Sequence, residues 1–212
     1  MSEHSLSTQV SQEILRKIRS GEIEGDTLIT EAMICETSGL SRTPVREALI
    51  GLRANGVLEK VPNKGYRVKQ MDEKAKNDIY IVLAYLDALA ARLAINKMTE
   101  EDYLKMSELI DLIDISIKYR NFANYQEQQE AFHSVYIERS GNEALKHSLD
   151  QIKESVPRYT YFSNDEDRLF AICASTNNEH REILQLLRDH KTEEVTQYLI
   201  YTHWQTKYED AI

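Results

Sequence analysis

The chain has 212 residues, of which 42% are apolar and 29% charged, and its formal net charge is −9. This is the composition of a globular protein of one or two domains, and the lack of any run of about 18 apolar residues excludes a membrane-spanning helix. Two distant cysteines exclude a disulfide framework, and a polar N-terminus without a signal-peptide core predicts a cytoplasmic protein.

The charge is divided unevenly along the chain. Residues 1–70 carry ten Lys and Arg against nine Asp and Glu, a net charge of +1, whereas the remainder carries sixteen against twenty-six, a net charge of −10. Because phosphate groups are bound by cations, any nucleic-acid binding must reside in the first part and depend on clustered arginines.

The first part begins with three expected helices. Apolar residues recur at helical spacing, with a glycine shortly after each segment, in residues 7–19, 30–37 and 41–55. Thr30 is a suitable N-cap for the second helix. Either Ser41 or Thr43 can cap the third.

Two short strand-like runs follow the third helix. Residues 57–61 and 66–69 are joined by Pro62-Asn-Lys-Gly65, whose composition predicts a turn. Three helices and a hairpin, with a Gly-containing turn between the second and third helices, are typical of a winged helix-turn-helix. In that motif the third helix enters the DNA major groove.

The second part is predicted to be entirely helical. Beyond Met71 only Gly141 and Pro157 interrupt the pattern, and Thr99-Glu-Glu-Asp102 is a capping signal for a helix. Further helices are expected over residues 125–140, 143–162, 165–189 and 192–208. The prediction is a mainly α protein, with a winged helix-turn-helix in residues 1–70 and an antiparallel bundle of six or seven helices in residues 71–212.

The helix-turn-helix segment closely resembles the GntR family of bacterial transcription regulators. The resemblance rests on Ser41-Arg-Thr-Pro-Val-Arg-Glu-Ala-Leu49, Gly56-Val-Leu58 and Gly65-Tyr-Arg-Val68. The second part resembles the helical FCD-type ligand-binding domain of the FadR subfamily, through Phe132-His133, Ser140-Gly-Asn142 and Glu179-His-Arg-Glu-Ile-Leu184.

The resemblance implies a homodimer that binds double-stranded operator DNA. A small metabolite held in the helical domain would change the affinity for the operator, and such regulators are often repressors. The matching positions for the main DNA contacts are Arg42, Thr43 and Arg46.

Side-chain chemistry supports these contacts independently. Arg42 and Arg46 lie one helical turn apart, and an arginine fork can bind guanine or clamp a phosphate. Hydroxyl groups near a helix N-terminus suit phosphate binding. The remaining expected contacts are Ser41 and, in the wing, Asn63, Lys64 and Gly65.

The resemblance also implies a divalent metal site, because many relatives bind a metal such as Zn, Ni or Mn with one aspartate and three histidines. His133 and His180 match directly, but the aspartate position is Gln129 and the last histidine position is Thr202. His203 comes one residue late and would point elsewhere unless its helix contains a bulge. The expected site is therefore incomplete. His133 and His180 either hold a metal weakly or hydrogen-bond a ligand, or each other through water.

The expected effector pocket surrounds these histidines. Many relatives carry an arginine at the position of Leu83, and a leucine cannot neutralise an anion. The effector is then less acidic, or apolar, or held instead by Arg158. The full predicted pocket comprises Leu83, Gln129, His133, Arg158, His180 and Thr202.

Two other classes of function can be compared with this interpretation. The sequence contains no P-loop, dinucleotide fingerprint, nucleophile elbow or HExxH motif, so an enzyme is not expected. The alternative is a DNA-binding dimer whose helical domain has lost sensing and serves only assembly.

Overall fold

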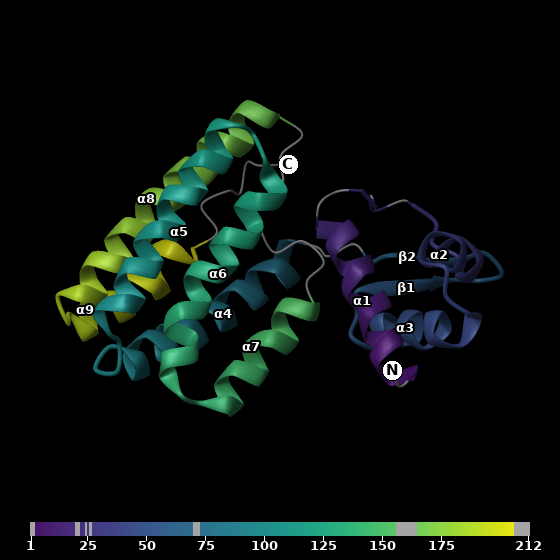
Figure 1. Ribbon diagram of the computed structural model, residues 1–212, viewed down its shortest axis with the longest axis horizontal. Helices are drawn as coiled ribbons and strands as arrows, with labels where there is room; N and C mark the ends of the chain where they lie inside the picture. The colour runs from purple at the N-terminus through teal and green to yellow at the C-terminus, as the bar shows by residue number, and fades with distance from the viewer. Residues whose placement is uncertain are drawn as a thin grey trace. The chain divides into compact units, whose positions relative to one another are not determined.

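The computed structural model describes residues 3–19, 22–23, 25, 27–69, 73–155 and 165–205. Its contacts define two compact units, one built mainly on residues 1–72 and the other mainly on residues 73–152 and 160–212 (Figure 1). None of the described helices is long and apolar enough to cross a membrane.

The first unit is a three-helix cluster with a two-stranded wing. Its elements are α1 (Glu3–Arg19), α2 (Glu31–Ser38), α3 (Arg42–Ala54), β1 (Leu58–Val61) and β2 (Gly65–Val68). The predicted winged helix-turn-helix is confirmed, although α1 begins four residues earlier than the apolar pattern indicated.

The turn between α2 and α3 is fixed by local backbone chemistry. The Thr30 hydroxyl accepts a hydrogen bond from the Met33 amide at 3.2 Å, as its N-cap position predicted. Gly39 ends α2 in the left-handed conformation, with φ of 70°. Ser41 occupies the N-cap of α3 but makes no side-chain capping bond there.

One face of α3 is buried and the other is left for solvent. Val45 and Leu49 are fully buried, and Leu52 is nearly so. They pack against apolar side chains of α1, α2 and the wing, including Ile14, Ile18, Ile29, Ile34 and Val57. This packing holds α3 firmly and turns its charged residues outward.

The wing is an antiparallel hairpin whose register pairs Leu58 with Val68 and Val61 with Gly65. Ile29 extends it, because its amide donates to the Tyr66 carbonyl at 2.7 Å and its carbonyl accepts from the Tyr66 amide at 2.8 Å. Gly65 therefore lies close to another backbone. A Cβ there would come within 2.4 Å of the Ile29 carbonyl oxygen.

The second unit contains six α-helices and a terminal π-helical turn within its described residues, which confirms the predicted bundle (Figure 1). The elements are α4 (Glu73–Ala94), α5 (Glu100–Lys118), α6 (Phe122–Ser140), α7 (Glu143–Ser155), α8 (Glu166–Arg188), α9 (Thr192–Tyr198) and the π-helix η1 (Leu199–His203). The expected capping box before α5 is present, with Thr99 and Asp102 each bonding the other's backbone.

Two expected helices differ from the structure. The helix predicted over residues 143–162 is observed as α7, and its remaining part from residue 156 lies outside the described residues. The helix predicted over residues 192–208 changes from α9 to the π-helix η1 at Leu199, and residues beyond 205 lie outside the described part.

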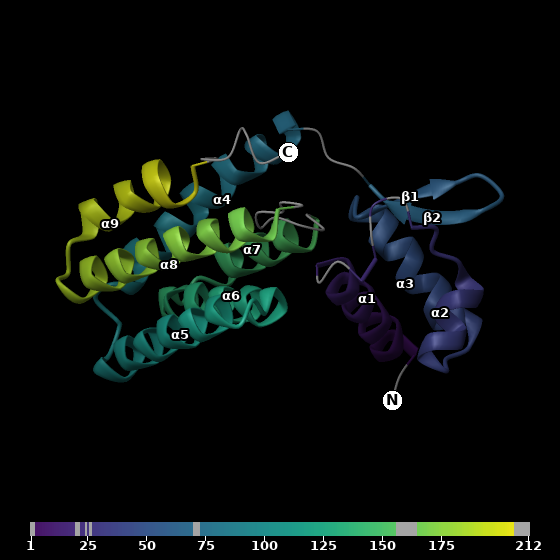
Figure 2. The same ribbon diagram turned by 90° about the horizontal axis from the view of Figure 1, so that it is seen from above.

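The other elements of the bundle pack mainly around α4 and α8. Helix α4 packs against α6, α9 and η1, and α8 contacts α5, α9 and η1 (Figure 2). Phe132 and Tyr136 of α6 are fully buried in the main core. The sequence thus builds an apolar interior in which any polar group must have a partner.

We predict that Gly65→Ala lowers the free energy of unfolding by about 1–3 kcal/mol, because Gly65 has φ of 136° and faces the Ile29 carbonyl. Gly51→Ala is the matched control, since Gly51 lies within α3 and a Cβ there meets nothing within 4 Å. That control should raise stability by about 0.5–1 kcal/mol. Urea unfolding followed by circular dichroism measures both, and a destabilised control or a neutral Gly65→Ala would contradict the argument.

Candidate functional site

The first turn of α3 presents the predicted DNA-reading side chains to solvent. Arg42, Thr43 and Arg46 are exposed, while Pro44 and Val45 are buried beneath them. Ser41 precedes them at the N-cap, with its hydroxyl not engaged in capping. The arrangement places two exposed arginines at the N-terminus of a helix, which is suited to phosphate and base edges.

Arg46 is held by a residue of the preceding helix. Its Nε donates to Glu31 Oε1 and its Nη2 donates to Glu31 Oε2, both at 2.9 Å. The hydrogen bonds from Arg46 lower the pKa of the Glu31 carboxyl, and the same bonds raise the pKa of the Arg46 guanidinium. The sequence analysis missed Glu31, because the two residues are fifteen positions apart and only the angle between α2 and α3 joins them.

The predicted wing residues lie at the hairpin tip. Asn63 and Lys64 are exposed, Asn63 has φ of 60°, and the Lys64 amide donates to the Val61 carbonyl at 3.1 Å. The close approach to Ile29 explains why position 65 requires a glycine. Lys64 is therefore an exposed cation at the tip of the wing.

Three histidines converge inside the helical unit. His133 of α6, His180 of α8 and His203 of η1 are 4%, 0% and 4% exposed. One ring nitrogen from each lies within 4.8 Å of the others. The structure therefore joins the two predicted histidines to a third, and this trio can bind a metal ion.

The π-helix η1 brings the third histidine into the cluster. A π-helical turn adds one residue to an α-helix and so shifts the direction of every later side chain. His203 comes one residue later than the resemblance required, and the π-helix spans Leu199–His203. The bulge on which its inclusion depended is thus present, and Thr202 is left half-buried while His203 is buried.

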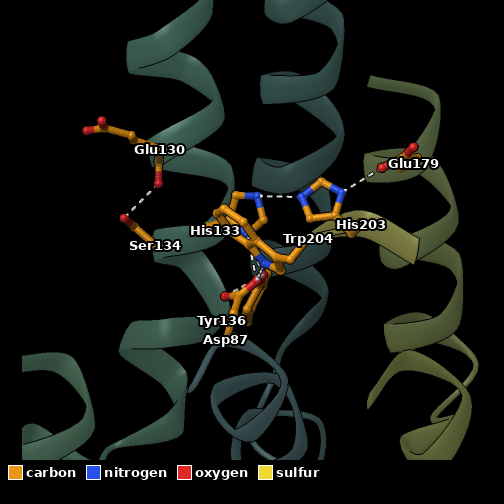
Figure 3. A network of polar contacts seen from close by, with 8 residues as sticks. All are labelled: Asp87, Glu130, His133, Ser134, Tyr136, Glu179, His203 and Trp204. Atoms are coloured by element: carbon orange, nitrogen blue, oxygen red, sulfur yellow. Dashed lines mark hydrogen bonds and ion pairs between the residues drawn. The ribbon is translucent and has the colours of Figure 1, made fainter. Parts of the chain in front are cut away.

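Two buried carboxylates orient the histidine rings (Figure 3). Asp87 of α4 lies 3.1 Å from His133 Nδ1, and Glu179 of α8 lies 3.0 Å from His203 Nδ1. Asp87 also accepts hydrogen bonds from the Tyr136 hydroxyl and the Trp204 indole, both at 2.8 Å. Trp204 lies 117 positions after Asp87 in the chain, so the sequence contains no local signal of this bond.

The protonation states follow from these partners. Burial alone would raise the pKa of Asp87, but the electrostatic attraction of His133 and the hydrogen bonds from His133, Trp204 and Tyr136 lower it overall. Burial lowers the pKa of His203 and lowers that of His180 well below its usual value. Asp87 is therefore ionised near neutral pH, whereas His180 and His203 are uncharged.

Among the described residues, the Nε2 atoms of the three histidines have no hydrogen-bond partner outside the cluster. Because carboxylates accept at Nδ1 of His133 and His203, those Nδ1 atoms carry the protons, and both Nε2 atoms present lone pairs. These two Nε2 atoms face each other at 3.2 Å (Figure 3). The Nε2 of His180 has no partner among the described residues, and its Nδ1 lies 3.3 Å from Asn177 Oδ1.

The other predicted pocket residues have different surroundings. Gln129 lies one turn before His133, is buried, and has an Oε1 without a hydrogen-bond partner in the described part of the chain. Leu83 is buried in the main apolar core. Arg158 lies outside the described residues.

A winged helix-turn-helix followed by a helical bundle is the architecture of a DNA-binding regulator with a second, helical domain, and the family models agree with it. Residues 6–68 match the model described as "Bacterial regulatory proteins, gntR family", and residues 78–205 match the FCD domain. The chain belongs to the GntR family of bacterial transcription regulators, in the FadR-like group that carries a C-terminal FCD domain.

Curated relatives and solved structures support the family. The Nta operon transcriptional regulator of Aminobacter aminovorans is 26% identical over 81% of this chain and 79% of its own length. The gluconate operon transcriptional repressor of Bacillus subtilis is 28% identical over 72% of this chain and 60% of its own length. The structure of E. coli McbR/YncC shares the fold, with a TM-score of 0.79, 20% identity, and coverage of 92% of this chain and 91% of that chain. The relatives are transcription regulators and not enzymes, as expected.

We predict that His203→Ala weakens metal binding at least about a hundredfold, because changes to partners outside the metal ligands already cost about 10–100-fold. Thr202→Ala, at the adjacent position, should retain the wild-type affinity. Titration of metal-stripped protein with Zn²⁺, Ni²⁺ and Mn²⁺, followed by calorimetry and by the fluorescence of Trp204, the one tryptophan of the chain, measures both. A loss confined to Thr202→Ala would show that the π-helical register is not the one that binds metal.

Proposed function

We propose that this transcription regulator binds its operator as a homodimer and that a small metabolite, bound beside a divalent metal in the helical domain, changes operator affinity. The observation that carries the proposal is the buried trio of His133, His180 and His203, from which one ring nitrogen each lies within 4.8 Å of the others. In this proposal residues 1–70 form the DNA-binding domain, and residues 71–212 form the effector-binding and dimerisation domain.

The residues present fit a metal ion. Two nitrogens bound to one tetrahedral zinc at about 2.0–2.1 Å lie roughly 3.3 Å apart. The two facing Nε2 atoms of His133 and His203 are 3.2 Å apart, and a cation between them removes the repulsion of their lone pairs. Asp87 and Glu179 supply the carboxylate partners that metal-bound histidines usually have.

Gln129 favours an effector that itself binds the metal. Its neutral amide oxygen is a poorer ligand than a carboxylate, and it has no hydrogen-bond partner in the described structure. When bound, the metal supplies a Lewis-acidic position for an oxygen donor of the effector. We therefore propose that the effector is a metal-chelating acid, with the three histidines fixing the ion.

Dimerisation is supported by an exposed apolar stripe on α4. Ile81, Val82, Tyr85 and Leu89 recur at helical spacing and are each at least 41% exposed. A stripe of this kind is typical of a surface that pairs with another copy. Repression is the sign of regulation that we propose, since relatives include the gluconate operon transcriptional repressor and the E. coli repressor RspR.

We predict that Arg46→Ala weakens operator binding at least about tenfold and leaves the fold intact, because one good bidentate contact contributes about 1–3 kcal/mol. The operator is a duplex selected by the wild-type protein from a randomised library. Fluorescence anisotropy at fixed salt gives the affinity. The matched control is Arg53→Ala in the last turn of α3, which should bind within about twofold of wild type. Equal affinities of wild type and Arg46→Ala would remove Arg46 from the DNA contacts.

We predict that a metal-chelating acid, from a panel of di- and tricarboxylates tested with metal-loaded protein, changes operator affinity at least fivefold. The same compound should have no effect on the His133→Ala/His180→Ala double variant. If metal binds but no compound shifts either the melting temperature or the operator affinity, the helical domain serves assembly alone.

A further inference from the structure

Glu31 occupies the start of α2, opposite the first turn of α3. Both of its carboxylate oxygens bind Arg46, one at Nε and one at Nη2, at 2.9 Å each. Such paired contacts fix the plane of the guanidinium as well as its position. Two of the five N–H groups of Arg46 are thereby occupied, and the remaining donors are left for another acceptor.

Folding stability does not account for this ion pair. The side chains of Arg46 and Glu31 are 57% and 31% exposed, and exposed pairs contribute little to stability. Both helices are already held by the apolar core beneath them, where Ile34 of α2 and Leu49 of α3 are buried. The ion pair is thus better explained by the binding of another molecule at this surface than by the stability of the fold.

The carboxylate also stands within a group of cations. Arg42 of α3 and Lys60 of β1 act on Glu31 electrostatically, in addition to Arg46. A carboxylate paired with Arg46 offsets the charge of that arginine, so the pair reduces the share of Arg46 in binding that depends on charge alone. A base edge, in contrast, is recognised by donors held at a fixed angle.

We propose that Glu31 is a positioning residue that sets sequence discrimination: it orients Arg46 toward a base edge and withholds that arginine from non-specific phosphate contacts. The inference rests on the proposed role of Arg46 in DNA reading. Glu31 thereby lowers the total affinity for DNA. It raises the ratio of the affinity for the operator to the affinity for unrelated DNA, as repulsive elements in recognition sites commonly do.

The test compares two duplexes, the library-selected operator and a scrambled sequence of equal length and composition. Glu31→Gln removes the charge and keeps the shape, while Glu31→Asp keeps the charge and withdraws the oxygens by one methylene. Glu36→Gln, on the exposed face of the same helix, is the matched charge control. Each change is also made with Arg46→Ala, and all proteins are measured at several salt concentrations.

The expected result is a lower discrimination ratio, by at least about fivefold, in both Glu31 variants but not in Glu36→Gln. With Glu31→Gln, binding to the scrambled duplex should strengthen. Its salt slope should steepen by about 0.9, because Arg46 becomes free to contact a phosphate. In the double variants, the discrimination ratio should equal that of Arg46→Ala alone, because the Glu31 changes act through Arg46. Melting temperatures should stay within about 2 °C of wild type.

Two outcomes would overturn the inference. One is an unchanged ratio in both Glu31 variants while Arg46→Ala still weakens operator binding, which refutes the role of Glu31 alone. The other is the same effect of Glu31→Gln with and without Arg46, which would make Glu31 a general charge. An Arg46→Ala variant with unchanged operator affinity would instead refute the proposed role of Arg46.

Discussion

The histidine site depends on one buried carboxylate. Asp87 accepts hydrogen bonds from Tyr136 and Trp204 and contacts the ring of His133, so residues from three separate segments meet at a single anion. Removing a buried charge of this kind leaves all of its donors unsatisfied, which makes such a centre costly to change. Because α4 directly follows the wing in the chain, Asp87 also places the site on the helix nearest in sequence to the DNA-binding unit.

The register of η1 shows what sequence reasoning could and could not reach. His133 and His180 were predicted directly, because they match the positions of the metal-binding histidines in relatives. Helix geometry indicated that His203 could join them only if its helix contained a bulge. Whether a bulge forms depends on tertiary partners, since nothing in the residues of Leu199–His203 requires one. The partner here is Glu179, a buried acid on α8 whose relation to His203 follows only from the packing of the two helices.

Local signals predicted the DNA-binding unit well. Thr30, Gly39 and the wing turn act through neighbours within a few residues, and the chain encodes such interactions directly. Non-local effects were less accessible. The close approach of Gly65 to the Ile29 carbonyl was not foreseen, and its predicted DNA contact stays a prediction. Glu31 was not identified because its partner lies on another helix.

Charge balance links the buried site to the effector that it can accept. Asp87 and Glu179 are the acids that face the histidines, and the buried polar residues of the described chain include no lysine or arginine. A metabolite anion entering this interior without a metal would meet uncompensated negative charge. One divalent cation held by the three histidines balances the charges of both carboxylates. Because Gln129 is neutral, the net charge of the site is then zero. An acidic effector therefore requires the metal, whereas the same residues without it suit a neutral compound.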